Sequence, residues 1–300
     1  MPDWLIALPC WGDAYRSRFA AMCWPSWQAA LEPIRNRCRI LLHTDEPAFA
    51  RLFDGYLVDV RPRPGDARHY QHGAFADAHR EALREAGFGE IVAIQNADHI
   101  LSRECFVAAE QRFALGKKLI MCAGTRTVGP LFGNPPPVMA AAELLQWAWH
   151  YAHTITQQST WPRGLSAVPS VLYFSDGRNV ILRAWHLHPF AVFKDRRLDF
   201  AGTVDRDLPD NFRPDEIHVV TDPNELAQAE ISPPTRHFAL RPDAMTEGYL
   251  YWWGCKHASP MHWHFFDRRI VLVGSATDTY CDEIADRLIA RRQRDMVEAA

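Results

Sequence analysis

The sequence predicts an α/β fold with a doubly wound, mostly parallel sheet, and three observations lead to it. Short apolar runs alternate with amphipathic stretches, one run is apolar on both of its faces, and polar residues follow several of the runs. A strand that is apolar on both faces is typical of the centre of a parallel sheet that helices cover. A chain of 300 residues with 48% hydrophobic content can bury such a sheet in a large core.

The first half of the chain alternates strands and helices. Apolar runs predict strands at residues 5–8, 39–42, 57–60, 91–94 and 119–123. Helical spacing of apolar residues predicts helices over about 15–34, with an interruption near Pro25, over 70–86 and over 104–115. Residues 91–94 are apolar without a break, so we expect this strand at the centre of the sheet.

The pattern changes after Gly124. We expect a Pro/Gly-rich loop at 129–137, a long helix over 139–156, and a hairpin over 170–194 with Asp176-Gly177 as its turn. An aromatic and histidine cluster over 249–266 and a charged final helix follow. The chain is thus expected to form one continuous domain with two halves, 1–125 and 126–300, the second carrying a mixed hairpin and a C-terminal elaboration.

Composition excludes some classes of function. A net charge of −3 offers no basic surface for nucleic acid, which is therefore not an expected partner. Seven cysteines without a CxxC pair are typical of reduced thiols. The N-terminus does not have the pattern of a signal peptide, and no stretch is long enough to cross a bilayer. We expect a cytoplasmic protein without a transmembrane segment; peripheral contact with a membrane remains compatible with the sequence.

Polar residues follow three of the predicted strands, in the segments Pro9–Trp11, His43–Asp45 and Asn96–Asp98. In open α/β sheets, ligands bind at the carboxyl ends of the strands, so these segments are expected to converge. Asp98 suits a divalent metal that in turn binds phosphate oxygens, and Asp45 suits a nucleobase or ribose. The alternative is helix capping, by Asp98 or Ser102 near residue 103 and by Asp45 after Glu46-Pro47.

This order of elements resembles the nucleotide-binding half of GT-A glycosyltransferases. The resemblance covers roughly residues 4 to 125, with an Asp-x-Asp-like triplet at Asn96–Asp98, and extends loosely to about 210. It implies a nucleotide-diphosphate sugar as donor and Mn or Mg as cofactor, with Asp98 as a metal ligand and Asn96 facing the ribose or the metal. The first triplet position is Asn here, and a neutral amide attracts a dication less than a carboxylate does.

The resemblance assigns further donor contacts to the first half. Residues 1–125 become the nucleotide-sugar-binding half, in which Pro9 and Trp11 at the first strand end line the donor site. The segment before the helix over 70–86, with Arg68, His69 and His72, often contacts the donor in this family. A solvated turn is the alternative for that segment.

The second half is expected to bind the acceptor. In inverting members of the family, an Asp or Glu of this half removes the proton from the attacking hydroxyl, and the local order around Asp205 and Asp207 is similar. General-base work needs an ionised carboxylate within hydrogen-bond reach of that hydroxyl. A surface turn with Arg206 as ion-pair partner is the alternative for both residues.

Histidines of the second half are candidates for additional metal or phosphate contacts. Alternation along a strand would place His186 and His188 on one face, where such a pair binds a metal, accepts a proton or contacts an acceptor hydroxyl. His188 is preferred as a metal ligand, and simple packing is the alternative. His262 and His264 would share one side of a strand in the same way. Some retaining family members add a C-terminal His to the metal and a Lys to the diphosphate, which points to Lys256 with His257, His262 or His264, of which His264 is preferred as the metal ligand. An aromatic packing element is the alternative.

The expected function is glycosyl transfer, of a hexosyltransferase-like kind, from a nucleotide-diphosphate sugar to a hydroxyl of a glycan or small acceptor. We expect it to serve bacterial-type glycan or surface polysaccharide synthesis. Two alternatives stay open: a sugar-nucleotide-binding protein without turnover, and a nucleotidyltransferase that acts on a sugar phosphate. The second normally has a Gly-rich, basic loop after the first strand, and residues 9–13, Pro-Cys-Trp-Gly-Asp, are neither.

Overall fold

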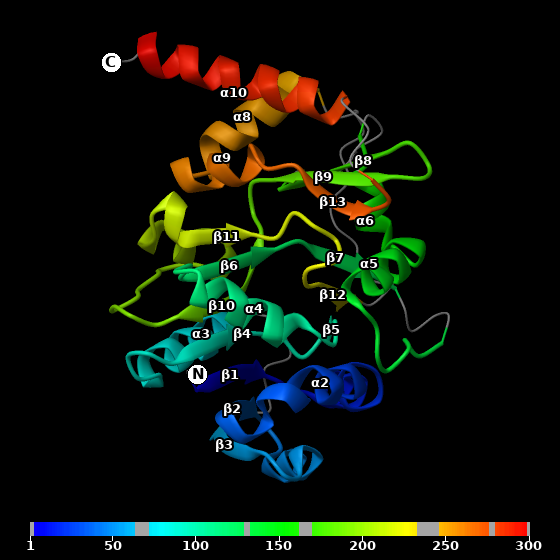
Figure 1. Cartoon of the computed structure of the whole chain (residues 1–300), viewed down its shortest axis with the longest axis vertical. Helices are drawn as coiled ribbons and strands as arrows, with labels where there is room; N and C mark the ends of the chain where they lie inside the picture. Colours follow the sequence, from blue (N-terminus) through cyan, green and yellow to red (C-terminus); the bar gives the residue numbers. More distant parts are fainter. Residues whose placement is uncertain are drawn as a thin grey trace.

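A computed structural model describes residues 3–63, 72–128, 133–161, 170–232, 246–275 and 280–298 (Figure 1). Within these ranges the main sheet has seven strands, in the order β11 (Ile217–Val219), β6 (Leu119–Cys122), β10 (His188–Phe193), β4 (Ile91–Ile94), β1 (Trp4–Pro9), β2 (Cys38–Thr44) and β3 (Leu57–Pro62). Strand β10 runs antiparallel to both of its neighbours, β4 and β6. The other pairings in this sheet are parallel.

Helical segments connect the parallel strands. Between β1 and β2 lie α1 (Asp13–Arg18), the π-helical turn η1 (Phe19–Cys23), α2 (Trp24–Leu31) and the 3-10 turn η2 (Glu32–Arg37). The 3-10 turn η3 (Pro47–Phe53) leads to β3, α3 (His72–Glu85) precedes β4, and α4 (Cys105–Ala114) precedes β6. The break near Pro25 follows from chemistry, since a proline without an N–H is tolerated only in the first turn of a helix, where α2 carries it.

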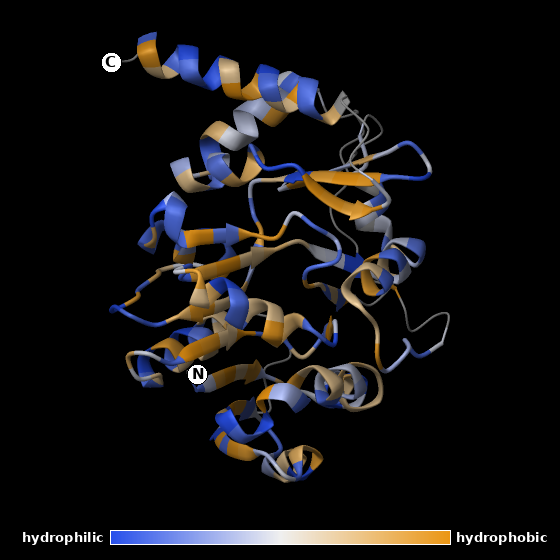
Figure 2. Cartoon of the chain, viewed as in Figure 1, coloured by the Kyte–Doolittle hydropathy of each residue, from blue (hydrophilic) through white to orange (hydrophobic). Residues whose placement is uncertain are grey.

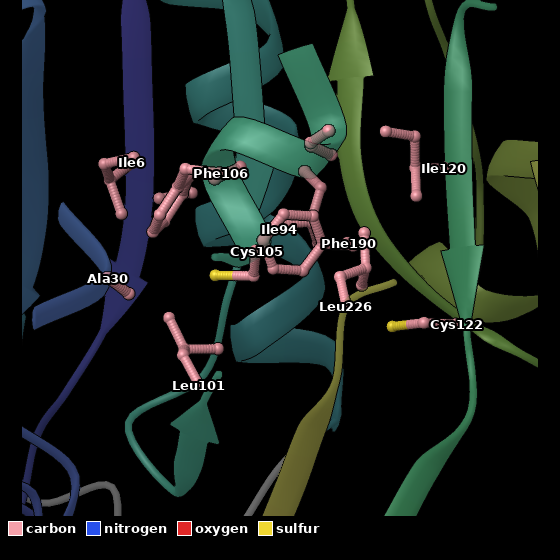
Figure 3. Close-up of a cluster of buried hydrophobic side chains, with 14 of the residues drawn as sticks. Ile6, Ala30, Ile94, Leu101, Cys105, Phe106, Ile120, Cys122, Phe190 and Leu226 are labelled. Atoms are coloured by element: carbon pink, nitrogen blue, oxygen red, sulfur yellow. The ribbon is translucent and has the colours of Figure 1, made fainter. Parts of the chain in front are cut away.

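The core of the main sheet is mostly aliphatic. Figure 3 shows α4 in front of the sheet, with Phe106 and Cys105 over Ile6, Ile94 and Phe190. The ring of Phe106 lies 5.0 Å from that of Trp4, edge to face, and 5.5 Å from that of Phe190. All four residues of β4 are fully buried, as expected for a central strand.

A small sheet extends the carboxyl edge of the main one. Its order is β5 (His99–Leu101), β12 (Gln228–Ile231) and β7 (Gly124–Thr127). Strand β12 is antiparallel to β5 and parallel to β7, so Glu230 pairs with His99 on one side and with Arg126 on the other. This sheet therefore brings residue 230 next to the segment that follows β4.

A third, antiparallel sheet carries the C-terminal helices (Figure 1). It consists of β13 (Ile270–Val273), β9 (Val180–Ala184) and β8 (Val171–Ser175), and α8 (Glu247–His257), α9 (Pro260–Phe266) and α10 (Tyr280–Glu298) pack near it. A second hydrophobic cluster, which we call the aromatic layer, includes Trp185, Trp253, Trp263 and Phe266. Figure 2 shows alternating hydrophilic and hydrophobic bands along α10, whose Ile284 and Leu288 are buried in this layer.

The remaining elements are short. They are α5 (Ala141–His150), α6 (Thr154–Gln158), α7 (Val204–Asp207), and the 3-10 turns η5 (Leu208–Asn211) and η6 (Pro214–Glu216). None of the helices in the described ranges is long and apolar enough to cross a membrane.

The predicted fold class, a doubly wound, mostly parallel α/β sheet, is confirmed, and the elements over 4 to 125 follow the order that the resemblance implied. The hairpin around Asp176-Gly177 is present, but it ends at β9, and β10 joins the main sheet instead. The long helix over 139–156 is wrong: it is split into α5 and α6, because Ala152 forms a bridge to Thr127. The predicted strand at 262–264 is also wrong, since these residues lie in α9.

Candidate active site

The carboxyl ends of β1, β2 and β4 meet at one edge of the main sheet. Cys10 N donates to His43 O at 2.8 Å, and Gln95 N donates to Ala7 O at 3.3 Å. The three polar segments that follow these strands therefore converge, as their positions in the sequence predict.

Asp45 joins the ends of β1 and β2. Its carboxylate accepts the N–H of Gly12 at 3.0 and 3.1 Å and pairs with Arg16. Gly12 has a φ of 82°, a conformation that favours glycine. Partial burial raises the pKa of Asp45, but the hydrogen bonds from Arg16 and Gly12 outweigh it and hold the pKa below its ordinary value. The capping alternative for Asp45 is wrong, because Glu46 caps the next helical turn through Ala48 N at 3.1 Å.

Asp98 lies between β4 and β5 and is 3% exposed. Burial raises its pKa well above the ordinary value, the nearby Glu230 adds to this, and Arg126 and Arg18 act in the opposite direction. Arg126 Nε donates to Glu230 Oε2 at 2.8 Å. Helix α4 begins at Cys105 without a side-chain cap, so the capping alternative for Asp98 is wrong.

Asn96 contributes an acceptor without a partner. Its Oδ1 is buried and has no hydrogen-bond partner among the described residues. A buried polar atom of this kind usually meets a ligand, an ion or a water molecule. Asp98, two residues further on, adds a carboxylate, and oxygen donors of these two kinds are the chemistry that Mg and Mn prefer. In the part of the chain that the structure describes, no group of three or more His, Cys, Asp or Glu side chains could hold a metal by itself.

A histidine network lies beside this edge. His188 begins the antiparallel β10 and pairs with Cys122, the last residue of β6, so it also lies at the carboxyl edge. Its ring is 4.8 Å from that of His99, edge to face. His99 Nδ1 and Gln95 Oε1 are 3.1 Å apart, and Gln95 O is 3.1 Å from His79 Nε2. His79 and His99 thus contact Gln95, the residue that precedes Asn96, and His188 contacts His99.

Burial keeps these imidazoles neutral. It lowers the pKa of His79 to about 4 and that of His99 far below the ordinary value. Burial also lowers the pKa of His188, while Asp205 and Glu230 act in the opposite direction. The carboxylate of Asp205, from the second half of the chain, therefore lies within electrostatic range of the same edge.

The structure separates the two base candidates. Asp207 locks the turn before α7, because its carboxylate accepts the N–H of Gly202 and lies 3.7 Å from Arg206 Nε. A Cβ on Gly202 would lie 2.5 Å from Asp207 Oδ2, which shows how close this contact is. The described residues give the Asp205 carboxylate neither a hydrogen bond nor an ion pair.

Arg80 of α3 fixes the approach to α7. Its Nη1 donates to the carbonyl oxygens of Ala201 at 3.0 Å, Gly202 at 3.3 Å and Phe200 at 3.4 Å. The guanidinium also lies 5.2 Å from the ring of Phe200. One residue of the first half thus holds the loop that carries Asp205.

The other predicted site residues have varied surroundings. Pro9 is the buried last residue of β1, and Trp11 stacks on Phe75 with ring centroids 4.8 Å apart. Lys256 is exposed on α8, with Nζ 4.9 Å from the ring of Trp252. The side chain of His72, like all of Arg68 and His69, lies outside the described residues.

The strand geometry predicted for His264 is wrong. In α9, residues two apart point to different sides of the helix, so His262 is 1% exposed while His264 is half-buried and contacts Arg268 at 3.2 Å. Among the described residues, His264 does not belong to any group of three potential metal ligands. The sequence did contain a signal for α9, since Ser259 and Pro260 are favoured at the cap and first position of a helix.

Three residues near the edge were not singled out from the sequence. Glu230 lies in a strand of four residues, and His79 and Arg80 lie within a helix that was predicted only from its apolar face. Each is placed by a partner far along the chain: Glu230 by Arg126, His79 by Gln95 and Arg80 by Ala201. No local pattern identifies such pairs.

No protein-family model matches this chain, and no curated protein matches it. In structure it is similar to S. aureus TarS 1–349, with 10% identity over 96% of this chain and 71% of that one, and a TM-score of 0.36. It is also similar to a putative glucose-1-phosphate thymidylyltransferase from Bacillus anthracis in complex with a sucrose, with 12% identity, 43% of this chain, 56% of that one and a TM-score of 0.29.

A third similar structure is CMP:2-keto-3-deoxy-manno-octonic acid synthetase complexed with CTP. Here the identity is 12%, the match covers 43% of this chain and 54% of that one, and the TM-score is 0.28. All three TM-scores are low, so these likenesses assign no residue role and no activity to this chain.

Proposed function

We propose that this chain is a glycosyltransferase that moves a sugar from a nucleotide-diphosphate donor to an acceptor hydroxyl. The observation that carries the proposal is the convergence of two groups at one edge of the sheet. On one side are the buried Asp98 carboxylate and the unpartnered Asn96 Oδ1. On the other side is Asp205, whose carbonyl oxygen lies 3.4 Å from His262 Nε2; the ring of His262 lies 4.7 Å from that of His186, two residues before His188.

Asp98 and Asn96 would hold Mg or Mn together with oxygens of the donor diphosphate. A bound dication offsets the charge that develops on the departing diphosphate. Two protein oxygens leave coordination positions for phosphate oxygens and water, which is typical of Mg sites. The Asp45–Arg16 pair at the neighbouring strand ends would contact the ribose or base.

Asp205 would accept the proton of the attacking hydroxyl. It comes from the acceptor half, and the described residues offer it no competing cation or hydrogen-bond donor. Asp207 is assigned a structural role instead, because the Gly202 N–H and Arg206 occupy its carboxylate. Catalysis then rests on positioning and on electrostatic stabilisation of the leaving group.

The first test is a panel of nucleotide sugars with Mn or Mg, assayed for hydrolysis and for transfer to simple glycosides. We expect turnover that EDTA removes, and we expect Asp98→Ala to abolish it. Calorimetry with UDP and GDP in the presence of Mn measures donor binding separately. Binding without turnover would identify the chain as a sugar-nucleotide-binding protein, and full activity of Asp98→Ala would overturn the site.

A second test compares the two carboxylates of α7. We expect Asp205→Asn to lower kcat by about 10²–10⁴, the usual contribution of a general base. Asp207→Asn is the matched control, because its amide oxygen can still accept the Gly202 N–H, and its kcat should change only a few-fold. The assignment fails if the two variants lose the same activity.

A further inference from the structure

The short helix α7 and the turn η5 are attached to α9 by two contacts. Ser259, the N-cap of α9, donates through Oγ to Asp210 Oδ1 at 2.7 Å. One turn further on, His262 Nε2 lies 3.4 Å from the carbonyl oxygen of Asp205. Both contacts reach the segment that carries the proposed base.

The hydrogen bonds define which nitrogen of His262 carries the proton. Ser259 N donates to His262 Nδ1 at 3.0 Å, so Nδ1 is the acceptor. In a neutral imidazole the other nitrogen is then the donor, and Nε2–H points to Asp205 O. Burial lowers the pKa of His262, although Asp205 and Asp210 act in the opposite direction, so the ring stays neutral near pH 7.

A second imidazole holds the ring from the side. The ring of His186 lies 4.7 Å from that of His262, and its Nε2 is 3.4 Å from the carbonyl oxygen of His257, at the end of α8. His262 itself is 1% exposed. The imidazole that contacts Asp205 is therefore confined by α8, α9 and the segment before β10.

We propose that His262 is a positioning residue that orients Asp205 for proton abstraction. The inference rests on the proposed function. Helix α7 has only four residues and no side-chain cap, so it does not hold its own geometry. A contact from α9 to the Asp205 carbonyl limits the movement of the backbone that carries the carboxylate. This matters because catalytic groups need to be held to within about 0.5 Å of their productive position.

The two nitrogens of His262 make different contacts, so substitutions that remove one contact at a time can test the proposal. Nδ1 stabilises the start of α9 through Ser259, whereas Nε2 contacts Asp205. His262→Asn keeps an acceptor near the Nδ1 position but lacks a donor that reaches Asp205. His262→Gln keeps a donor near the Nε2 position but moves the acceptor away from Ser259.

We expect His262→Asn to fold with a modest loss of stability, smaller than that of His262→Gln, and to bind UDP with Mn as the wild type does. Its kcat should fall about tenfold or more at an unchanged donor KM. His262→Gln should lose stability yet keep kcat within about threefold. His264→Asn, on a different and less buried side of the same helix, is the matched control and should change neither quantity by more than a little.

Three outcomes would overturn the proposal: an unchanged kcat in folded His262→Asn, a kcat that follows stability across the two variants, or a loss of donor binding. If His262→Asn does not fold, His262→Gln decides, and a folded Gln variant with kcat reduced more than about tenfold counts against the proposal. Failure of the proposed function would look different, because the wild type itself would then show no transfer.

Discussion

The main-sheet core and the aromatic layer are packed in different ways. The first consists largely of aliphatic residues on strands, such as Ile6 and Ile94, which can be exchanged for residues of similar volume. In the second, the ring of Trp185 stacks on Phe266 at 3.9 Å and 10° and meets Trp263 edge-on at 5.5 Å. Flat, rigid rings leave less freedom of arrangement. The sheet core therefore depends on hydrophobic volume, and the aromatic layer depends on shape.

The largest effect is expected in the sheet core. Phe106→Ala removes a fully buried ring that contacts Trp4 and Phe190, and we expect a loss of about 3–5 kcal/mol in the free energy of unfolding, measured in urea. Phe88→Ala is the control, because Phe88 is 74% exposed, and it should change stability by less than about 0.5 kcal/mol. Similar losses in both variants would show that hydrophobic volume does not control this core.

A smaller but more specific effect is expected in the aromatic layer. A Cβ on Gly254 would lie 2.7 Å from Trp263 Cζ2 and 3.0 Å from ring carbons of Trp185. Gly254→Ala should therefore lower the free energy of unfolding by about 1–3 kcal/mol, the usual cost of overpacking. Gly248→Ala lies on the same helix, where the nearest atom would be 3.8 Å away, and should be neutral or slightly stabilising. A stabilising Gly254→Ala would contradict the dependence on shape.

The smallest expected effect is on acid stability. Burial lowers the pKa of His79 to about 4, so between pH 6.5 and 4 the unfolded chain binds a proton that the folded chain does not. Stability should fall as the pH drops through this window, with about 1–2 kcal/mol from His79 at pH 5. In His79→Gln, the midpoint of urea unfolding should change less between pH 7 and pH 5 than it does in the wild type. An equally steep pH dependence in this variant would falsify the assignment.

Tryptophan fluorescence in the same series would also sharpen the comparison. His79 belongs to α3 beside the main sheet, whereas Trp185, Trp253 and Trp263 report on the aromatic layer. If the two regions unfold together, His79→Gln shifts the unfolding transition that the tryptophans of the aromatic layer report, although His79 itself lies beside the main sheet.

The sheet core was the more predictable region. Strands β1 and β4 are continuous apolar runs and β2 has one at its centre, and a buried parallel strand has that pattern whatever its neighbours are. The aromatic residues and histidines of α9 have no comparable period, so its side-chain pattern was compatible with a strand. Only the N-cap Ser259 and the following Pro260 indicate a helix rather than a strand here, and a signal of two residues is easily missed.

The candidate site was predictable to the same degree. The strand ends that carry Asp45, Asn96 and Asp98 follow from sheet topology, and they converge. The position of Glu230 next to Asp98 depends on β12, a strand of four residues that pairs with segments more than 100 positions away. The proposed choice between Asp205 and Asp207 depends on two contacts of Asp207, with the Gly202 N–H and with Arg206. Contacts of this kind are properties of the folded chain and have no local signature.

The reversed strand β10 has a consequence for how the molecule assembles. It lies between β4 and β6, so these strands, although close in sequence, have no direct pairing with each other until residues 188–193 arrive. A chain cut at residue 125 would leave the edges of both strands unpaired, and unpaired edges promote aggregation. The first half is therefore expected to depend on the second for its completion during synthesis. We expect the insertion of β10 to be the slow, long-range step in folding.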